Sequence, residues 1–275
     1  MRSLRLVVGQ PIRVAEAFLR LGYQQAISYP LSFVSGQLST LLPAVIYFFV
    51  AKMLRGQGPE VGFDYFTFVI LGLIGVRVMD AGLRGFSHEL DTAIQRGWLE
   101  MFLTEPVRWR FLPFAMSLWP TVIALSGAVV IWGVSVILGA NYVLTGLPIA
   151  ILVGVLGLLA GLAIGTMAGS VKVLAKSGDP FLLLYSLIAQ VFSGVYFTID
   201  VMPAPLRAIS WVIPQTYVNL ALRKALMPRS EGISGSTLQS LLVLAAFVVV
   251  LYPLSLWVYG RALGYGRKLG VLSGY

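Results

Sequence analysis

Long apolar runs separated by short polar or turn-forming segments dominate this chain of 275 residues. A transmembrane helix needs about 20 apolar residues to cross about 30 Å of hydrocarbon, and six runs are of about that length. The pattern therefore predicts an all-α integral membrane protein with six transmembrane helices, forming a single transmembrane domain over residues 1–275. The predicted spans are residues 30–51, 64–84, 111–138, 147–171, 181–199 and 237–260.

Polar residues recur at helical spacing just before the first span. Arg13, Glu16 and Arg20 lie among apolar residues within residues 10–27. This pattern predicts an N-terminal amphipathic interfacial helix, and Pro30 separates it from the first span. The alternative is that the segment is only the polar beginning of that span.

A broken segment of intermediate polarity, residues 201–226, separates the fifth and sixth spans. Pro203, Pro205 and Pro214 interrupt it, and each proline removes a backbone hydrogen-bond donor and disfavours helix at the preceding residue. Irregular backbone survives at membrane depth only where protein or water covers it. We therefore expect a re-entrant helical pair, two short helices that dip into the membrane and turn back.

Two spans carry residues that need a structural explanation. The fourth has glycine at every fourth position from Gly157 to Gly169, which predicts a face that another helix approaches closely. The second contains Arg77 and Asp80 in its last part, where a charge at the bilayer centre would cost several kcal/mol unless paired. Because these two residues are three positions apart near the end of the predicted span, we expect an ion pair at the interface.

Composition narrows the possible classes of protein. The chain is 58% hydrophobic and 11% charged, whereas soluble domains are about 25% charged. It contains no cysteine and one histidine, so disulfides, thiolate metal sites and a histidine metal cluster are excluded. The net charge of +9 arises from basic residues beside the apolar runs, so it indicates membrane topology and no nucleic-acid partner.

The distribution of basic residues predicts the orientation in the membrane. If both termini are cytoplasmic, fourteen of the 20 lysine and arginine residues lie in the inner segments and six in the outer ones. Basic residues favour the cytoplasmic side. We therefore expect a multi-pass protein of the cell inner (plasma) membrane, with both termini cytoplasmic and residues 201–226 at the outer face.

The longest inner connection contains a second amphipathic pattern. Leu90, Ile94, Trp98 and Phe102 recur every four residues within residues 88–103, and the polar residues Glu89, Asp91, Gln95 and Arg96 lie on other faces. This predicts a short helix at the cytoplasmic membrane surface. It could be a simple connection, or its apolar stripe could dock into a groove on a partner protein.

The motifs in these two segments resemble a known family. RGWLEMFLTEPV, with Gly97, Glu100 and Pro106, resembles the G-x-L-E-x-x-x-x-x-P segment between the second and third spans of type 2 ABC transporter permeases. The outer segment is similar to that family's signature as well, although Met202 stands where the family pattern has leucine. The residues that carry this second likeness are Ser193-Gly194, Met202-Pro203, Pro214-Gln-Thr-Tyr217 and Ala221-Leu-Arg223.

The resemblance implies roles for three groups of residues. The cytoplasmic coupling helix, residues 88–103, would contact an ATPase through Leu90, Ile94, Gly97, Trp98, Glu100 and Phe102. The re-entrant pair would form an outer gate that includes Pro203, Pro214, Tyr217 and Arg223, with Arg223 as an anchor at the outer interface. The first and fifth spans would line a substrate pathway with Tyr47, Phe48, Tyr185, Phe192, Tyr196 and Phe197.

The resemblance also implies an ATP-driven exporter made of several subunits. Two permease chains, identical or paralogous, would pair with separate nucleotide-binding subunits that hold ATP and Mg²⁺ and would move an amphipathic, lipid-like or drug-like substrate, or a lipid-linked polymer, outward. This sequence has no GxxxxGK[ST] loop, so we expect neither ATP hydrolysis by that route nor a cofactor in the chain itself. The alternatives are an ion-gradient-driven secondary transporter and a non-transporting membrane scaffold or intramembrane enzyme. The near absence of ionisable residues in the spans disfavours the first alternative, and the lack of clustered catalytic groups disfavours an enzyme.

Overall fold

The computed structural model describes residues 2–54, 64–95, 109–175, 180–228 and 235–268, and these residues contain helices, turns and irregular segments but no strand. The all-α class is therefore confirmed over this part of the chain. Its elements are α1 (Arg2–Ser28), α2 (Pro30–Leu54), α3 (Tyr65–Gln95), α5 (Leu112–Ile137), η1 (Leu144–Gly146), α6 (Leu147–Ala175), α7 (Pro180–Phe192), η2 (Ile199–Val201), α8 (Ala204–Val212), α9 (Pro214–Leu226) and α10 (Thr237–Lys268).

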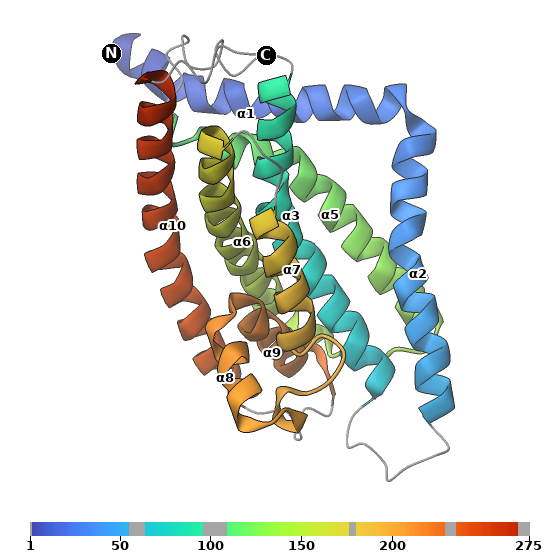
Figure 1. Cartoon of the computed structure of the whole chain (residues 1–275). Helices are drawn as coiled ribbons and strands as arrows, with labels where there is room; N and C mark the ends of the chain where they lie inside the picture. The colour runs from blue at the N-terminus through green and yellow to red at the C-terminus, as the bar shows by residue number, and fades with distance from the viewer. Residues whose placement is uncertain (1, 55–63, 96–108, 176–179, 229–234, 269–275) are drawn as a thin grey trace.

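The helices form a bundle with one helix lying across its end. Figure 1 shows α2, α3, α5, α6 and α10 running lengthwise, whereas α1 crosses the end at which α10 finishes. The short helices α8 and α9 lie at the opposite end of the bundle. This arrangement agrees with an interfacial helix before the first span, and it places α1 and the end of α10 on one side and the broken segment on the other.

Five described helical segments are long and apolar enough to cross a membrane. They correspond to α2, α3, α5, the η1–α6 segment and α10. The fifth predicted span, residues 181–199, contains only α7, whose 13 residues extend about 20 Å at the usual rise. Helix α7 ends because Ser193 and Gly194 leave the helical path, Gly194 with a positive φ of 72°. Six complete spans therefore stay a prediction.

Helix α3 is longer than its predicted span and changes the expected inner connection. It runs without interruption for 31 residues, past the predicted end at residue 84 and into the segment predicted as a separate coupling helix. A separate helix beginning at residue 88 is therefore wrong for the described part of that segment. The physical reason is that Phe86 and Leu90 are apolar and fully buried, so core packing continues the same helix.

The contact between α3 and α6 confirms the packing role of the glycines in the fourth span. A Cβ atom added at Gly161 would lie 2.2 Å from the carbonyl oxygen of Met79, and one at Gly165 would lie 2.3 Å from that of Leu83. No side chain fits at such distances. The two backbones can therefore approach closely, which places α3 at the centre of the bundle with α5 and α6 on its flanks.

Candidate functional site

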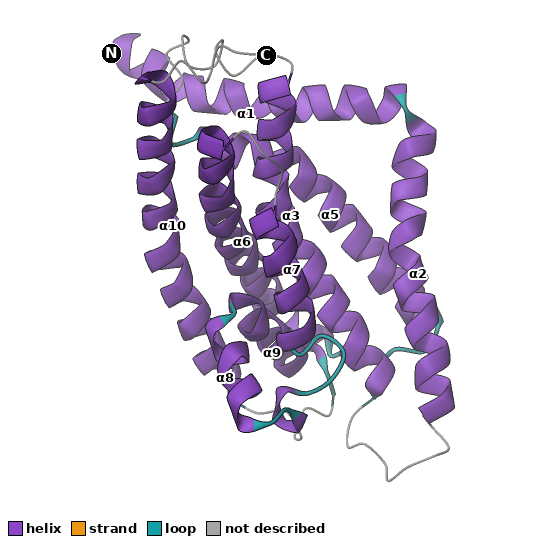
Figure 2. Ribbon diagram, in the orientation of Figure 1, coloured by secondary structure: helices purple, strands orange, loops and turns teal. Residues whose placement is uncertain are grey.

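The broken segment forms two short helices separated at a proline. Helix α8 has nine residues and begins after Pro203, and α9 has 13 residues and begins at Pro214. Ile213 between them is extended, as expected for a residue that precedes proline. Two helices therefore meet at the predicted break, visible as a short loop between α8 and α9 in Figure 2.

Side-chain hydrogen bonds fasten α9 to the end of α8. Tyr217 donates its hydroxyl to the carbonyl oxygen of Trp211 at 2.8 Å, and Thr216 donates to that of Ser210 at 2.6 Å. Both acceptors lie at the end of α8, where carbonyl groups lack a partner within the helix. The two helices therefore form one hydrogen-bonded unit, to which Pro203, Pro214 and Tyr217 belong.

Arg223 lies in the interior of the protein, so its predicted role as an anchor at the outer interface is wrong. Its side chain is 2% exposed and its guanidinium lies over the ring of Phe68, 3.4 Å from the centroid. Nε donates to the carbonyl oxygen of Phe68 at 3.1 Å, Nη1 to that of Gly194 at 2.7 Å and Nη2 to that of Val195 at 2.8 Å. These backbone carbonyls satisfy the buried charge, a partnership that the local sequence does not reveal.

Asn219 makes a similar link one turn earlier on α9. Its Nδ2 donates to the carbonyl oxygen of Ser193 at 3.0 Å, and its Oδ1 accepts from Nε2 of Gln215 at 3.2 Å. Together with Arg223, this amide holds the irregular residues after α7 against α9 and α3. The end of the bundle that contains α8 and α9 therefore holds one polar network inside an apolar surround.

The six aromatic residues predicted to line a pathway do not share one surface. Tyr47 and Tyr196 stack with ring centroids 5.2 Å apart, and Phe48 packs edge-on against Phe66 at 5.6 Å. Tyr185 lines a small cavity of about 90 Å³. Phe192 is half-buried and Phe197 is exposed. Their role in a substrate pathway stays a prediction.

A larger groove lies elsewhere, between α2, α3 and α5. Its volume is about 740 Å³, and its walls include Gln37 of α2, Arg77 and Asp80 of α3, Trp119 of α5 and Gln190 of α7. A cavity of about 560 Å³ at the α1 end of the bundle shares five lining residues with it. The shared residues are Gln25, Tyr29, His88, Glu89 and Trp119.

The charged residues beside this groove are paired differently from the sequence prediction. Asp80 contacts Arg84 at 3.3 Å, and Nη2 of Arg84 also donates to Oγ of Ser186 at 2.9 Å. Nε of Arg77 is buried without a hydrogen-bond partner among the described residues. The predicted pairing of Arg77 with Asp80 is therefore wrong, because the carboxylate of Asp80 pairs instead with Arg84, one turn further along α3.

The depth of these charges also differs from the prediction. Asp80 is the central residue of α3, and Arg77 lies three residues before it. They therefore lie near the middle of the helix and not close to its end. The sequence does show two charged residues within an apolar run. Because the predicted span ended too early, at residue 84, these residues were placed near its end.

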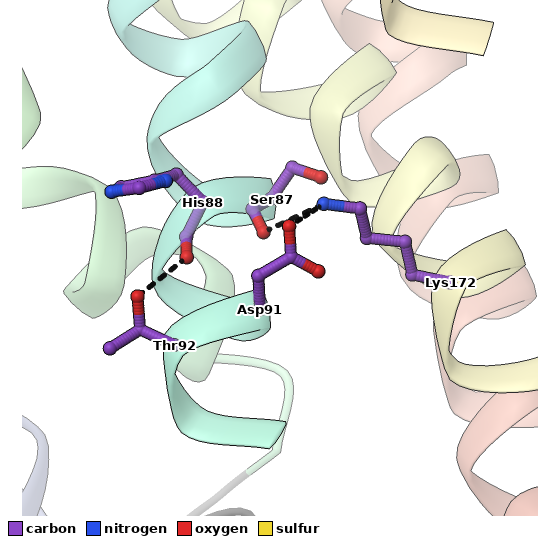
Figure 3. A network of polar contacts seen from close by, with 5 residues as sticks. All are labelled: Ser87, His88, Asp91, Thr92 and Lys172. Atoms are coloured by element: carbon purple, nitrogen blue, oxygen red, sulfur yellow. Dashed lines mark hydrogen bonds and ion pairs between the residues drawn. The ribbon is translucent and has the colours of Figure 1, made fainter. Parts of the chain in front are cut away.

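A second ion pair fixes the inner end of α3 to α6. Nζ of Lys172 contacts a carboxylate oxygen of Asp91 and lies 3.3 Å from the carbonyl oxygen of Ser87 (Figure 3). The Lys172 side chain is only 3% exposed, whereas Asp91 is partly exposed. In Figure 3 the side chain of His88 points away from this pair, and His88 lines the groove described above.

The predicted coupling residues fall into two groups. Leu90 is fully buried beside Phe86 and Tyr259, and Ile94 is half-buried against the same cluster. Leu90 therefore stabilises the bundle and does not belong to a docking surface, because a buried side chain cannot contact a partner. Gly97, Trp98, Glu100 and Phe102 lie outside the described residues.

Comparison with known families accounts for this architecture. The model of the ABC-2 type transporter family matches residues 16–227, from α1 through the end of α9. The chain belongs to the ABC-2 type transporter family. It is therefore an ABC transporter permease and a multi-pass membrane protein, and the matched domain is the transmembrane component of such transporters. No curated protein sequence matches the permease significantly.

Proposed function

We propose that this permease is the membrane subunit of an ATP-driven exporter in the cell inner (plasma) membrane. It moves an amphipathic substrate outward, either a lipid-like or drug-like molecule or a lipid-linked polymer. A separate nucleotide-binding subunit binds ATP and Mg²⁺, and a second permease chain, identical or paralogous, completes the translocation pathway. Membership of the ABC-2 family supports this function over an ion-gradient-driven transporter or a scaffold.

The observation that carries the proposal is the course of α3 between the two ends of the bundle. Near its outer end, the carbonyl oxygen of Phe68 accepts a hydrogen bond from Arg223 of α9. Near its inner end, Asp91 pairs with Lys172 of α6, immediately before the segment proposed to contact the ATPase. A displacement of the inner end would therefore reach α6 and the outer segment through one continuous helix.

The outer segment suits the role of a gate in this mechanism. In our proposal α8 and α9 are the re-entrant pair at the exit, with Pro203 and Pro214 at its turns. Helix α9 is almost entirely buried, whereas α8 exposes Leu206, Ile209 and Val212. The exposed face of α8 can therefore contact lipid or a second chain, and α8 is linked to α3 through α9 and Arg223.

A second permease chain has an apolar surface on which to pack. Helix α2 exposes Leu31, Leu38, Leu42 and Phe49 along its length. Lipid or another helix must cover these side chains in the membrane. We propose that part of this face meets the second chain, so that α2 lies beside the shared pathway.

Reconstitution with the ATPase encoded beside the permease tests the proposed function. We expect a stable complex whose ATP turnover depends on the permease. Replacing Trp98 with aspartate should weaken the complex, because an apolar docking residue becomes charged. Leu90 is unsuitable for this test, since its replacement would disturb the buried core.

Trp211→Asp provides the matched control, because Trp211 is a partly exposed tryptophan on the short helix α8, at the end of the bundle away from the inner connection. The control should retain the complex. Failure of every ATPase to bind the wild-type permease would refute ATP-driven transport. A Trp98→Asp variant that binds the ATPase as tightly as the wild type would refute the proposed coupling segment.

A further inference from the structure

The groove between α2, α3 and α5 contains one unusual combination of groups at mid-depth. Nε of Arg77 and Oε1 of Gln37 are both buried and both lack a hydrogen-bond partner among the described residues. Both atoms lie close to Gly127, at which an added Cβ atom would be 2.7 Å from Arg77 Nε and 2.9 Å from Gln37 Oε1. Unsatisfied buried polar groups are costly, so their presence here calls for an explanation.

Among the described residues, no acidic side chain forms an ion pair with Arg77. Among the described residues that line the groove, Arg77 is the only lysine or arginine. Asp80 also lines it, but Arg84 contacts its carboxylate at 3.3 Å. Glu89 lies at the inner mouth, 12 residues or about 18 Å along α3 from Arg77. The guanidinium of Arg77 is therefore the group in this part of the groove that can donate to an anion.

The rest of the groove has the character of a site for an amphiphile. Ser32, Gln37, Thr40 and Gln190 give it polar surface, whereas Phe33, Leu73, Val76 and Ile123 give it apolar surface. Its volume of about 740 Å³ falls in the range of small-molecule sites. The inner mouth at His88 and Glu89 joins the cavity beneath α1, so the polar surface continues toward that end of the bundle.

We infer that this groove binds an amphiphile with a phosphate or carboxylate headgroup, and that Arg77 recognises the anionic group. The headgroup accepts hydrogen bonds from the guanidinium. The apolar tail lies against the exposed side of α2 and the apolar wall of the groove. This inference rests on the proposed function only in taking the bound amphiphile to be the exported substrate.

A binding experiment with the full permease in neutral detergent tests the inference without any ATPase. The probes are a short-chain phosphatidic acid, a phosphatidylcholine of the same chain length, and inorganic phosphate. We expect the wild type to bind phosphatidic acid at least about tenfold more tightly than phosphatidylcholine, as one charged hydrogen-bonded contact allows. Inorganic phosphate at the same concentration should not displace the lipid, because it lacks the tail.

Three variants separate recognition from folding. Arg77→Gln should lose the preference for the anionic lipid, whereas Arg77→Lys should retain part of it because the charge is kept. Arg261→Gln removes an exposed cation that lies over Trp257 on α10, so this variant should retain the full preference. Melting temperatures of all variants show whether each one is folded.

The possible results lead to distinct conclusions. An Arg77→Gln variant that melts earlier but keeps the lipid preference would overturn the inference, because Arg77 would then only support the fold. A wild type that does not discriminate between the two lipids would overturn it as well, as would displacement of the lipid by inorganic phosphate at equal concentration. Loss of ATPase binding in the earlier experiment would leave the lipid measurement intact, so the two proposals fail separately.

Discussion

Replacement of Arg223 tests the outer hydrogen-bonded network directly. In the wild type, one buried guanidinium serves three carbonyl groups, those of Phe68 on α3 and of Gly194 and Val195 after α7. Arg223→Gln keeps a polar side chain but is too short and has too few donors to serve all three acceptors. Arg223→Lys keeps the charge but loses the planar fork that reaches acceptors in several directions.

The expected loss of stability follows from these bonds. A hydrogen bond to a charged group contributes about 1.5–3 kcal/mol, so three bonds contribute about 4–9 kcal/mol before burial of the charge is considered. Burial of the guanidinium offsets several kcal/mol of this gain. We therefore expect Arg223→Gln to lower the free energy of unfolding by about 3–5 kcal/mol, and Arg223→Lys by about half as much.

Two measurements check this expectation. Unfolding in mixed detergent gives the change in free energy, and Arg207→Gln serves as the control. Arg207 donates to the carbonyl oxygens of Asp200 and Met202 at the outer rim, so its loss should cost about 1 kcal/mol or less. A cysteine label reports local opening, because the natural chain contains no cysteine and Val195 is fully buried. The Val195→Cys thiol should react slowly in the wild-type background and much faster with Arg223→Gln.

The reasoning would be refuted by an Arg223→Gln variant that unfolds within about 1 kcal/mol of the wild type, as ordinary surface changes do, and leaves the thiol protected. That result would mean that other groups satisfy the three carbonyls. The reasoning would also be refuted if Arg207→Gln lowered the free energy of unfolding as much as Arg223→Gln does, because Arg207 is less buried than Arg223.

Three further predictions concern other parts of the fold. Gly161→Val should prevent the close approach of α6 to α3 and destabilise the bundle by about 3 kcal/mol or more. Gly133→Val is the control and should cost less than about 1 kcal/mol, because open space surrounds Gly133. Thermal unfolding of the two variants measures the difference. A double-mutant cycle with Asp91→Asn and Lys172→Met should give a coupling of about 1–3 kcal/mol, and additive effects would show that the ion pair contributes nothing. A cysteine at the exposed Ala208 of α8 should react with a membrane-impermeant reagent from outside, and labelling only from inside would overturn the orientation.

Several elements follow from local patterns. The apolar runs predict the five long helices because length and hydrophobicity alone decide whether a helix can cross lipid. The prolines predict the separation of α8 from α9, and the four-residue glycine spacing predicts the close contact of α6. In each case the physical cause lies within a few consecutive turns of the chain.

Helix ends and polar partners were predicted less well. Helix α3 continues beyond residue 84 because Phe86 and Leu90 pack into a cluster that includes Leu112 and Tyr259, which are distant in the sequence. Charged residues near the predicted end indicated an interface, although the helix extends for about three more turns. The single error in the end of the helix misplaced both the depth of Arg77 and the start of the coupling segment.

The sequence by itself determined that this protein is an all-helical membrane permease with an N-terminal amphipathic helix at one end and a proline-broken segment at the other. Hydrophobic run length, proline and glycine spacing are local properties, and the family motifs are local as well. Only the tertiary structure decided the surroundings of Arg223 and Arg77. Arg223 reaches a carbonyl 155 residues away, and Arg77 lies in a groove lined by residues from several helices. The partner of a buried charge depends on which distant segments pack together, and no local pattern records that packing.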